Sequence, residues 1–333
     1  MTAAKLKPRK NSEIKLIDKY HNNEAACIDF FYRAKWPQGF YCEKCGCTHY
    51  YFNASRRLYQ CSDCGHQNYL FSNTVFQDNK LPLFKLILGL YHLFVANKGI
   101  SAEDLANILD VNRKTAQLLC RKCRTLMSDS VSSHKMYSRY FEMDAFYIGS
   151  RTPKQQGKSS NKQCVLISLS TDADGEYPRY IRMRPVPCET KEHIRKFAES
   201  SMILDKIMID DKLVKSVLNT DGSQSYSILN DVMDVNNEKI VYEEDDHRLK
   251  WINIIIGNIK TQIGGIYHGV TRRCLPLYLN EQTWRFNHRR SGSNIMDKIQ
   301  KYIGQSQPRT RKMISRIEHI SEPYFTSADL VNS

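Results

Sequence analysis

The chain has 333 residues, and its 49 lysine and arginine residues outnumber its 35 aspartate and glutamate residues, which gives a formal net charge of +14. A length of this size predicts two or three domains, and a hydrophobic content of 41% argues against disorder as the default state. The basic excess predicts a polyanionic partner, which is most often nucleic acid.

Membrane insertion, secretion and a disulfide framework are all disfavoured by the sequence. The most apolar segment, residues 81–96, is interrupted by Lys85 and His92 and is too short and too polar to span a bilayer. The first residues are basic but lack the apolar stretch of a secretory signal. Eleven cysteines, several of them at scattered single positions, do not indicate paired disulfides. We therefore expect a cytoplasmic protein.

The first predicted element is a helix over residues 12–35 that ends before Trp36 and Pro37. The apolar side of this helix repeats at helical spacing. Its members are Ile14, Ile17, Tyr20, Ala26, Phe30 and Phe31.

Two Cys-x-x-Cys pairs follow this helix and are the strongest chemical signal in the chain. Two residues between cysteines allow both sulfurs of a pair to reach one ion, and two such pairs complete a tetrahedral thiolate site for zinc. Four thiolates leave no open coordination position, so the predicted zinc ion is structural. The predicted ligands are Cys42, Cys45, Cys61 and Cys64.

The residues around the cysteine pairs fit a zinc ribbon. Gly46 and Gly65 follow the two pairs and permit a tight turn at each. Residues 50–59 carry aromatic side chains that are typical of hairpin strands. Cys47 and His66 are adjacent alternative ligands, but the symmetric spacing favours the four paired cysteines.

A helix-turn-helix is predicted after the ribbon. Residues 81–97 are expected to form a buried helix, Ser101 and Asp104 resemble a capping box, and residues 113–127 are expected to form a second helix. Many helical hairpins share this outline, but the basic second helix favours DNA binding. The side chains that it offers to DNA are Arg113, Lys114, Gln117, Arg121, Lys122 and Arg124. Cys120 and Cys123 lack a partner pair and are expected to pack in the interior.

The second half of the chain changes to strands. Residues 139–150, 163–170 and 179–186 alternate in polarity, which predicts three strands in a meander. A helix over residues 189–200, a short strand over 217–220 and further helices from Tyr226 are expected to follow. Three strands, a helix, a strand and more helices is the order of a ribonuclease-H-like α/β domain.

Two aspartates occupy positions that suggest chemistry. Asp144 lies inside a predicted strand, where an ionised group is costly unless it is paired or binds a metal. Asp221 ends the 217–220 strand, and it could instead cap the helix after it. Carboxylates at neighbouring strand ends can hold two Mg²⁺ ions about 4 Å apart, an arrangement that serves phosphodiester chemistry.

The segment WINIIIGNIK, residues 251–260, predicts a helix with two distinct stripes. Isoleucines form the apolar stripe, and a second stripe about a quarter turn away is polar where it is not glycine. The second stripe could simply be a solvated helix edge. Its members are Asn253, Gly257, Lys260 and Gly264.

The ordered set of these motifs, with GIYHG and YLNEQTWRFNHRR after them, resembles the bacterial insertion-sequence transposases related to the Merlin superfamily of DNA transposons. The resemblance covers about residues 15–290. In that family the catalytic set is Asp, Asp and then Glu, Asn or His, followed seven residues later by Lys. The resemblance therefore implies Asp144, Asp221 and Asn253 as ligands of catalytic Mg²⁺ or Mn²⁺, and Lys260 as a phosphate contact.

Three positions where acidic residues are present or missing bear on the choice of metal ligands. Ala145 stands where relatives commonly carry a second acidic residue. The acidic run of residues 243–246 is expected to be a solvated loop, although one of its members could replace Asn253 as a ligand. Glu281 is expected to pair with Arg285, which is four residues further along the same helix.

We therefore predict a multidomain α+β protein with an N-terminal helix and zinc ribbon in residues 1–80, a helix-turn-helix in 81–130, a ribonuclease-H-like catalytic domain in 135–290 and a basic polar tail in 291–333. Within this last interval, residues 291–305 are expected to form a helix, and residues 306–333 are expected to be a flexible tail that is basic up to Arg316. The predicted function is a nucleoid-associated transposase that binds the DNA ends of its insertion sequence as a homodimer or higher oligomer, cleaves them with a metal ion and transfers them to target DNA. The alternatives are a non-catalytic DNA-binding regulator and an inactivated transposase.

Overall fold

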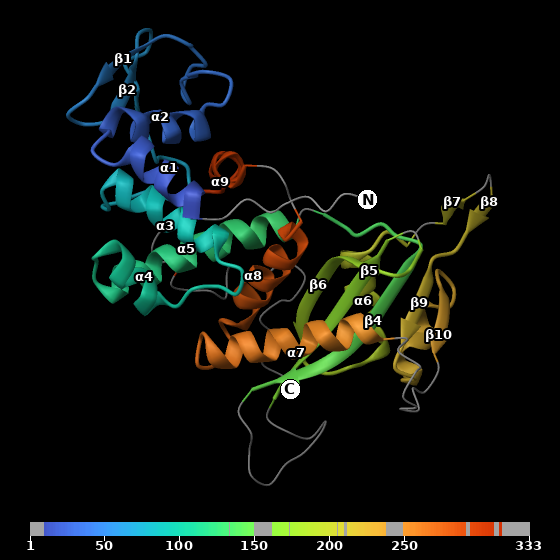
Figure 1. Cartoon of the computed structure of the whole chain (residues 1–333). Coiled ribbons are helices and arrows are strands. Elements are labelled where there is room, and N and C mark those ends of the chain that lie inside the picture. The colour runs from blue at the N-terminus through green and yellow to red at the C-terminus, as the bar shows by residue number, and fades with distance from the viewer. Residues whose placement is uncertain are drawn as a thin grey trace. The chain divides into compact units, whose positions relative to one another are not determined.

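The computed structural model describes residues 10–132, 134–149, 162–172, 174–204, 206–209, 212–237, 249–290, 294–309 and 313–314 (Figure 1). The chain divides into two compact units. The first unit comprises residues 1–96, 100–126 and 292–316, and the second comprises residues 97–99, 127–291 and 317–333. Across the described ranges, no helix has both the length and the apolarity that crossing a bilayer requires.

The first unit begins with two helices, α1 (Lys10–Tyr20) and α2 (Glu24–Lys35), so the prediction of one helix over residues 12–35 is wrong. Asn22 has a φ of +54°, which a continuous helix does not allow. The side chain of Asn23 then accepts a hydrogen bond from the backbone N–H of Ala26 at 3.1 Å and caps α2. The break leaves Ile14, one of the predicted apolar residues, 56% exposed.

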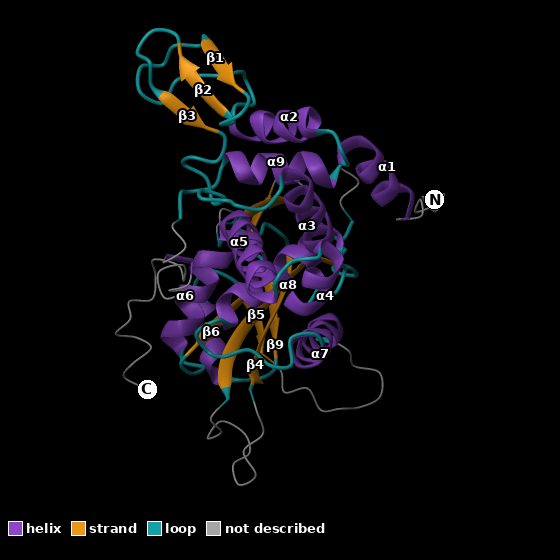
Figure 2. Cartoon of the chain, turned by 90° about the vertical axis from the view of Figure 1, so that its left-hand side faces the viewer, coloured by secondary structure: helices purple, strands orange, loops and turns teal. Residues whose placement is uncertain are grey.

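The zinc ribbon follows as an antiparallel sheet of three strands, which is seen clearly in Figure 2. The strands are β1 (Tyr50–Asn53), β2 (Leu58–Cys61) and β3 (Gln67–Tyr69). Tyr59 on β2 is buried among aromatic rings, with its ring centroid 5.0 Å from that of Trp36 and 4.8 Å from that of Phe52. The aromatic contacts therefore join the ribbon to the end of α2.

Three helices form the middle of the chain: α3 (Leu83–Val95), α4 (Ala102–Leu109) and α5 (Arg113–Ser132). Ser101 caps α4 by accepting the N–H of Asp104 at 3.0 Å, as the sequence predicted. Asp110 has a left-handed conformation and starts the short turn into α5. Because a Cβ at Gly89 would overlap with the side chains of Leu109 and Leu119, the glycine lets α3 pack closely on both α4 and α5.

The first unit also contains a helix from the end of the chain, α9 (Ile295–Gly304), which lies inside the interval predicted as a polar tail. It packs on α2 and α3, with Ile299 and Ile303 buried. The side chain of Gln300 donates to the carbonyl oxygen of Phe30 at 2.9 Å, and the hydroxyl of Ser306 accepts the N–H of Val75 at 3.1 Å. The chain therefore returns to its N-terminal unit.

The second unit is built on a five-stranded mixed sheet with the order β10-β9-β4-β5-β6. The meander of β4 (Tyr140–Ile148), β5 (Gln163–Thr171) and β6 (Pro178–Val186) is antiparallel, as predicted. The predicted strand β9 (Val217–Thr220) pairs parallel to β4. The sequence analysis missed β10 (Asp234–Asn237), which pairs parallel to β9.

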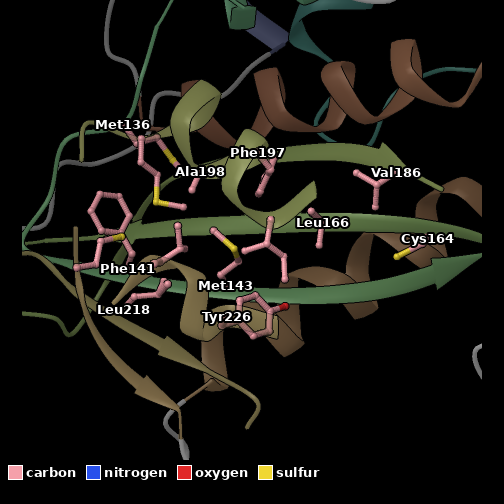
Figure 3. Close-up of a cluster of buried hydrophobic side chains, with 14 residues drawn as sticks. Met136, Phe141, Met143, Cys164, Leu166, Val186, Phe197, Ala198, Leu218 and Tyr226 are labelled. Carbon is pink, nitrogen blue, oxygen red and sulfur yellow. The ribbon is translucent and has the colours of Figure 1, made fainter. Parts of the chain in front are cut away.

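Alternation along the strands divides the interior of the second unit into two cores. On one face, Phe141 and Met143 pack with α6 (Lys191–Ser201) and the 3-10 helix η2 (Gln224–Leu229) (Figure 3). On the other face, Phe146 packs with α7 (Lys250–Gly265) and α8 (Leu275–His288). A separate hairpin of β7 (Ile207–Ile209) and β8 (Lys212–Val214) was also missed by the sequence analysis.

Candidate functional site

The four predicted zinc ligands form one group in the structure. The Sγ atoms of Cys42, Cys45, Cys61 and Cys64 all lie within 4.8 Å of one another. The Cys42 and Cys64 sulfurs are 3.6 Å apart, and the Cys45 and Cys61 sulfurs are 3.5 Å apart. Tetrahedral ligands at a Zn–S distance of about 2.3 Å lie about 3.8 Å from one another, so the four sulfurs fit one structural zinc ion.

The backbone around the cysteines supports the same geometry. Gly46 and Gly65 have φ angles of +78° and +67°, and the N–H of each bonds to the carbonyl of the first cysteine of its pair. Asn68 is fully buried, and its amide nitrogen lies 3.8 Å from the sulfur of Cys42. The alternative ligands Cys47 and His66 are not members of the sulfur group.

The predicted DNA-binding face of α5 is partly exposed and partly buried. Arg113, Lys114 and Gln117 are exposed, and Arg121 is half-buried. The prediction that Lys122 and Arg124 also face DNA is wrong, because these side chains are only 6% and 4% exposed. Helical periodicity would return some of these side chains to the surface, but residues 122–126 of α5 are all buried, so this stretch of the helix offers no exposed face.

Asp144 lies on β4, on the face that carries α7 and α8. Its neighbour on β5 is Ile167, which belongs to the core of that face. The Oδ1 atom of Asp144 accepts the N–H of Ala145 at 2.7 Å. Burial raises the pKa of Asp144 to about 7, and the negative charges of Asp221 and Glu189 act in the same direction.

Asp221 follows β9, and the pairing of the strands brings it beside Asp144. Glu142 on β4 is opposite Asn219 on β9, so the same parallel register carried two residues further sets Asp144 opposite Asp221. The carboxylate of Asp221 is exposed and accepts the N–H of Ser223 at 3.2 Å. The cap of η2 is Ser223, so Asp221 is not required to cap that helix.

The two stripes predicted on α7 are distinct in the structure. The apolar stripe is buried, with Ile252, Ile255, Ile256, Ile259 and Ile263 at most 7% exposed. Asn253, Gly257, Lys260 and Gly264 are exposed, and a Cβ added at either glycine would meet no heavy atom within 4 Å. The Nζ atom of Lys260 lies 5.7 Å from the ring centroid of Phe146 on β4, and its positive charge lowers the pKa of Asp144 against the stronger effect of burial.

A buried carboxylate fixes the start of α7 on the strand that carries Asp144. Glu142 is 5% exposed, and its Oε2 atom accepts the N–H of Ile252 at 3.1 Å. No side chain at the N-cap of α7 makes a capping hydrogen bond, so Glu142 satisfies a helix N–H from another element. Asn253 is the next residue, and its place beside β4 therefore depends on Glu142, which the sequence analysis did not single out.

The remaining acidic candidates separate into two cases. Glu281 is buried and pairs with Arg285 at 2.6 Å, as predicted, and it also accepts the hydroxyl of Tyr267 at 3.0 Å. This ion pair explains Glu281 as a structural residue. The acidic run of residues 243–246 lies outside the described residues.

Comparisons with known proteins match two segments of the chain. The family model of the ISXO2-like transposase domain matches residues 139–287, and that of the transposase zinc-ribbon domain matches residues 22–67. No curated protein matches the chain. Among solved structures, a chain in the crystal structure of a pre-cleavage Mos1 transpososome is similar, with 10% sequence identity, a TM-score of 0.21 and coverage of 66% of this chain and 78% of that chain. The matched segments contain the four cysteines, both aspartates and α7, and the chain thus carries a transposase zinc-ribbon domain followed by an ISXO2-like transposase domain.

Proposed function

We propose that this transposase binds the ends of its own insertion sequence, cleaves them with a divalent metal ion, and joins the freed 3′ hydroxyl to target DNA. The observation that supports the proposal is the parallel pairing of β4 with β9, because its register, continued two residues past Glu142 and Asn219, sets Asp221 across from Asp144. The catalytic unit is proposed to be ribonuclease-H-like, and the sheet order with three antiparallel strands followed by two parallel ones supports this.

Asp144 and Asp221 are the proposed ligands of catalytic Mg²⁺ or Mn²⁺. Carboxylate oxygens are the hard donors that these ions prefer. Burial is the main cause that raises the pKa of Asp144, and the negative charge of Asp221 adds to it; a bound cation would offset both effects. The bound cation would activate the attacking oxygen and stabilise the leaving oxygen of the phosphodiester.

The exposed stripe of α7 supplies the other two proposed residues. Asn253 would offer an amide oxygen to the same cation site. Lys260 would act on a phosphate group of the DNA as a point charge. Gly257 and Gly264 leave the surface open on the same side of the helix, so a DNA backbone has room to approach.

Recognition of the DNA ends is assigned to the exposed face of α5. Arg113, Lys114, Gln117 and Arg121 lie at or near the surface of the second helix of the predicted helix-turn-helix. Cationic and amide side chains at the start of such a helix are those that contact phosphates and base edges in the major groove.

Strand cleavage of a labelled element end in the presence of Mg²⁺ tests the catalytic assignment. Asp144→Ala and Asp221→Ala should abolish cleavage while DNA-end binding is retained, since each removes a charge that the cation needs. Asp174→Ala, which changes an exposed aspartate in the turn between β5 and β6, is the control and should cleave like the wild type. Cleavage by either site variant at the wild-type rate would reject the catalytic assignment and favour a non-catalytic DNA-binding regulator.

The role of Asn253 has a matched control on the same helix. Asn253→Ala should be severely impaired, whereas Asn258→Ala, also at an exposed position of α7, should cleave normally. Asn253→Glu should retain activity, because a carboxylate also donates oxygen to a hard cation. If the polar stripe were only a solvated edge, Asn253→Ala would change the free energy by less than about 0.5 kcal/mol and would cleave like the wild type.

A further inference from the structure

The start of α7 is held by two elements of the sheet. Glu142 on β4 accepts the N–H of Ile252, and the indole N–H of Trp251 donates to the carbonyl oxygen of Glu176 at 2.7 Å. Glu176 lies in the turn between β5 and β6. Asn253 comes two residues after Trp251, so its place depends on this turn as well as on β4.

The turn between β5 and β6 is shaped by hydrogen bonds of its own. The Oδ1 atom of Asp172 accepts the N–H groups of Glu176 and Tyr177 at 2.9 and 3.1 Å, and the N–H of Asp172 donates to the carbonyl oxygen of Tyr177 at 2.9 Å. Aspartate side chains often fix local backbone in this way. The carbonyl oxygen that Trp251 uses therefore belongs to a turn with a defined shape.

The end of α8 holds the strand that follows this turn. In the sheet that the structure describes, β6 is the last strand, and the side chain of Asn287 lies on its open edge, where it accepts the N–H of Ile181 at 2.8 Å and donates to the carbonyl oxygen of Ile181 at 3.1 Å. Arg289, at the C-cap of α8, donates to the carbonyl oxygens of Pro178 and Arg179, the first two residues of β6. These side chains bond to the edge as a further strand would.

The contacts of Arg289 and Trp251 meet in three consecutive residues, because Pro178 follows Tyr177 and Glu176 directly. Both helices lie on the same face of the sheet (Figure 1). A movement of the start of β6 would thus move the carbonyl oxygen of Glu176 and, through Trp251, the start of α7. A misplacement of about 1 Å at a reacting centre can cost about a hundredfold in rate, so such support has catalytic consequences.

We propose that Trp251 and Arg289 are positioning residues, which hold the start of α7 through the β5–β6 turn and so keep Asn253 beside β4. In this role neither side chain contacts the cation or the DNA. The inference rests on the proposed function, because it takes Asn253 as a ligand of the cation.

Single-turnover cleavage of a labelled element end by the full zinc-containing chain, with Mg²⁺, tests the role of Trp251. Trp251→Phe keeps an aromatic ring and removes the N–H, and it should slow cleavage about tenfold while the affinity for the DNA end is unchanged. The matched control is Tyr177→Phe, which removes a hydroxyl from the same turn and keeps the ring whose centroid lies 6.3 Å from that of Trp251. This control should cleave like the wild type.

Arg289→Lys tests the other end of the link. The substitution keeps the positive charge, so attraction to DNA is retained, but an ammonium group cannot reproduce the fixed fork of the guanidinium on the two carbonyl oxygens. Cleavage should slow about fivefold, whereas Arg290→Lys, the same substitution at the next exposed residue, should have no effect. Because both residues act through one turn, the double variant Trp251→Phe/Arg289→Lys should be no slower than its slower single variant.

The double variant separates a shared positioning role from two independent structural roles. Losses that multiply in the double variant, or wild-type cleavage by either single variant, overturn the inference. Urea unfolding confirms that each variant is folded under the assay conditions. Should Trp251→Phe fail to fold, the comparison of Arg289→Lys with Arg290→Lys still decides: a loss in the first variant alone supports the inference, and equal rates overturn it.

Asn253→Ala distinguishes this inference from the proposed function. If Asn253→Ala is impaired and Trp251→Phe cleaves at the wild-type rate, the inference is overturned while the proposed function stands. If Asn253→Ala cleaves like the wild type, the proposed role of Asn253 is itself rejected, and the inference falls with it.

Discussion

Lys122 on α5 provides a test of the interior of the first unit. Its charged side chain is buried in the structure, whereas the sequence placed it among the side chains that contact DNA. Its Nζ atom donates to the carbonyl oxygen of Gln77 at 3.2 Å and lies 5.6 Å from the ring centroid of Phe76. Burial lowers the pKa of Lys122 from 10.5 to about 8. The substitution Lys122→Met keeps an unbranched side chain, shortens it by one atom and removes the charge.

The sign and size of the effect follow from the change in pKa. Below pH 8 both the folded and the unfolded state hold the proton, so the folded state bears the full cost of burying it, about 3 kcal/mol. Between about pH 8 and 10.5 the folded state releases the proton first, so stability rises with pH through this window. Lys122→Met loses a hydrogen bond worth about 1 kcal/mol and should therefore be more stable than the wild type by about 2 kcal/mol at neutral pH.

Urea unfolding between about pH 7 and pH 10 measures this difference. A background with Trp251→Phe and Trp284→Phe leaves Trp36 of the first unit as the sole tryptophan reporter. The advantage of Lys122→Met should shrink as the pH rises, because other titrating groups are common to both proteins. A pH-independent difference, or a variant less stable than the wild type at neutral pH, would refute the reasoning.

DNA-binding measurements provide a second test of whether Lys122 is buried. Lys122→Met should bind the element ends like the wild type, because the buried side chain cannot reach a phosphate. Arg113→Glu and Lys114→Glu should weaken binding and reduce its salt dependence, since each exposed cation neutralises a phosphate and releases a counterion. Equal losses of affinity in Lys122→Met and Arg113→Glu would return Lys122 to the DNA-contacting face.

Substitutions at three further positions test the zinc site, the packing of α9 on α2, and the cap of α7. Metal analysis of the purified protein should find about one zinc ion per chain. The variant Cys42→Ser should lose this ion together with the local fold of the ribbon. A well-folded wild-type protein without zinc would contradict the zinc site. Gly304→Ala should destabilise the first unit by about 1–3 kcal/mol in urea, because a Cβ there would overlap with the carbonyl oxygen of Ala34 and α9 would have to move; an unchanged midpoint would contradict this packing. Glu142→Ala should speed amide hydrogen exchange in the first turn of α7. Glu142→Gln should not, because the amide oxygen of glutamine still accepts the N–H of Ile252. Equal exchange rates in the two variants would show that this hydrogen bond does not hold the start of α7.

Strong local patterns made much of the fold predictable from the sequence. Alternation of polarity predicted the strands β4, β5 and β6, and in the structure their successive side chains enter two different cores on opposite faces of the sheet. The spacing of the cysteine pairs predicted a sulfur group because two residues between ligands dictate the local geometry. The stripes of α7 followed from helical periodicity alone.

Tertiary context decided the features that the sequence analysis missed. A single Asn22 with positive φ ended α1, although the apolar pattern continued across the break. The depth of Lys122 depends on Phe76 and Gln77, which are distant in sequence, and helix periodicity does not show such neighbours. A helix over residues 291–305 was expected, but the polar composition of that interval did not show that α9 buries Ile299 and Ile303 against α2 and α3.

The charge at the proposed cation site gives a reason for asparagine at the third position. Burial raises the pKa of Asp144, the negative charges of Asp221 and Glu189 raise it further, and the positive charge of Lys260 lowers it, so Asp144 already lies near a group of carboxylates. Two divalent ions would bring four positive charges to this group, and the transferring phosphate adds negative charge of its own. A neutral amide at residue 253 still offers a hard oxygen donor without a further negative charge. Asparagine at residue 253 is therefore compatible with an active transposase whose cation is held chiefly by the carboxylates of Asp144 and Asp221.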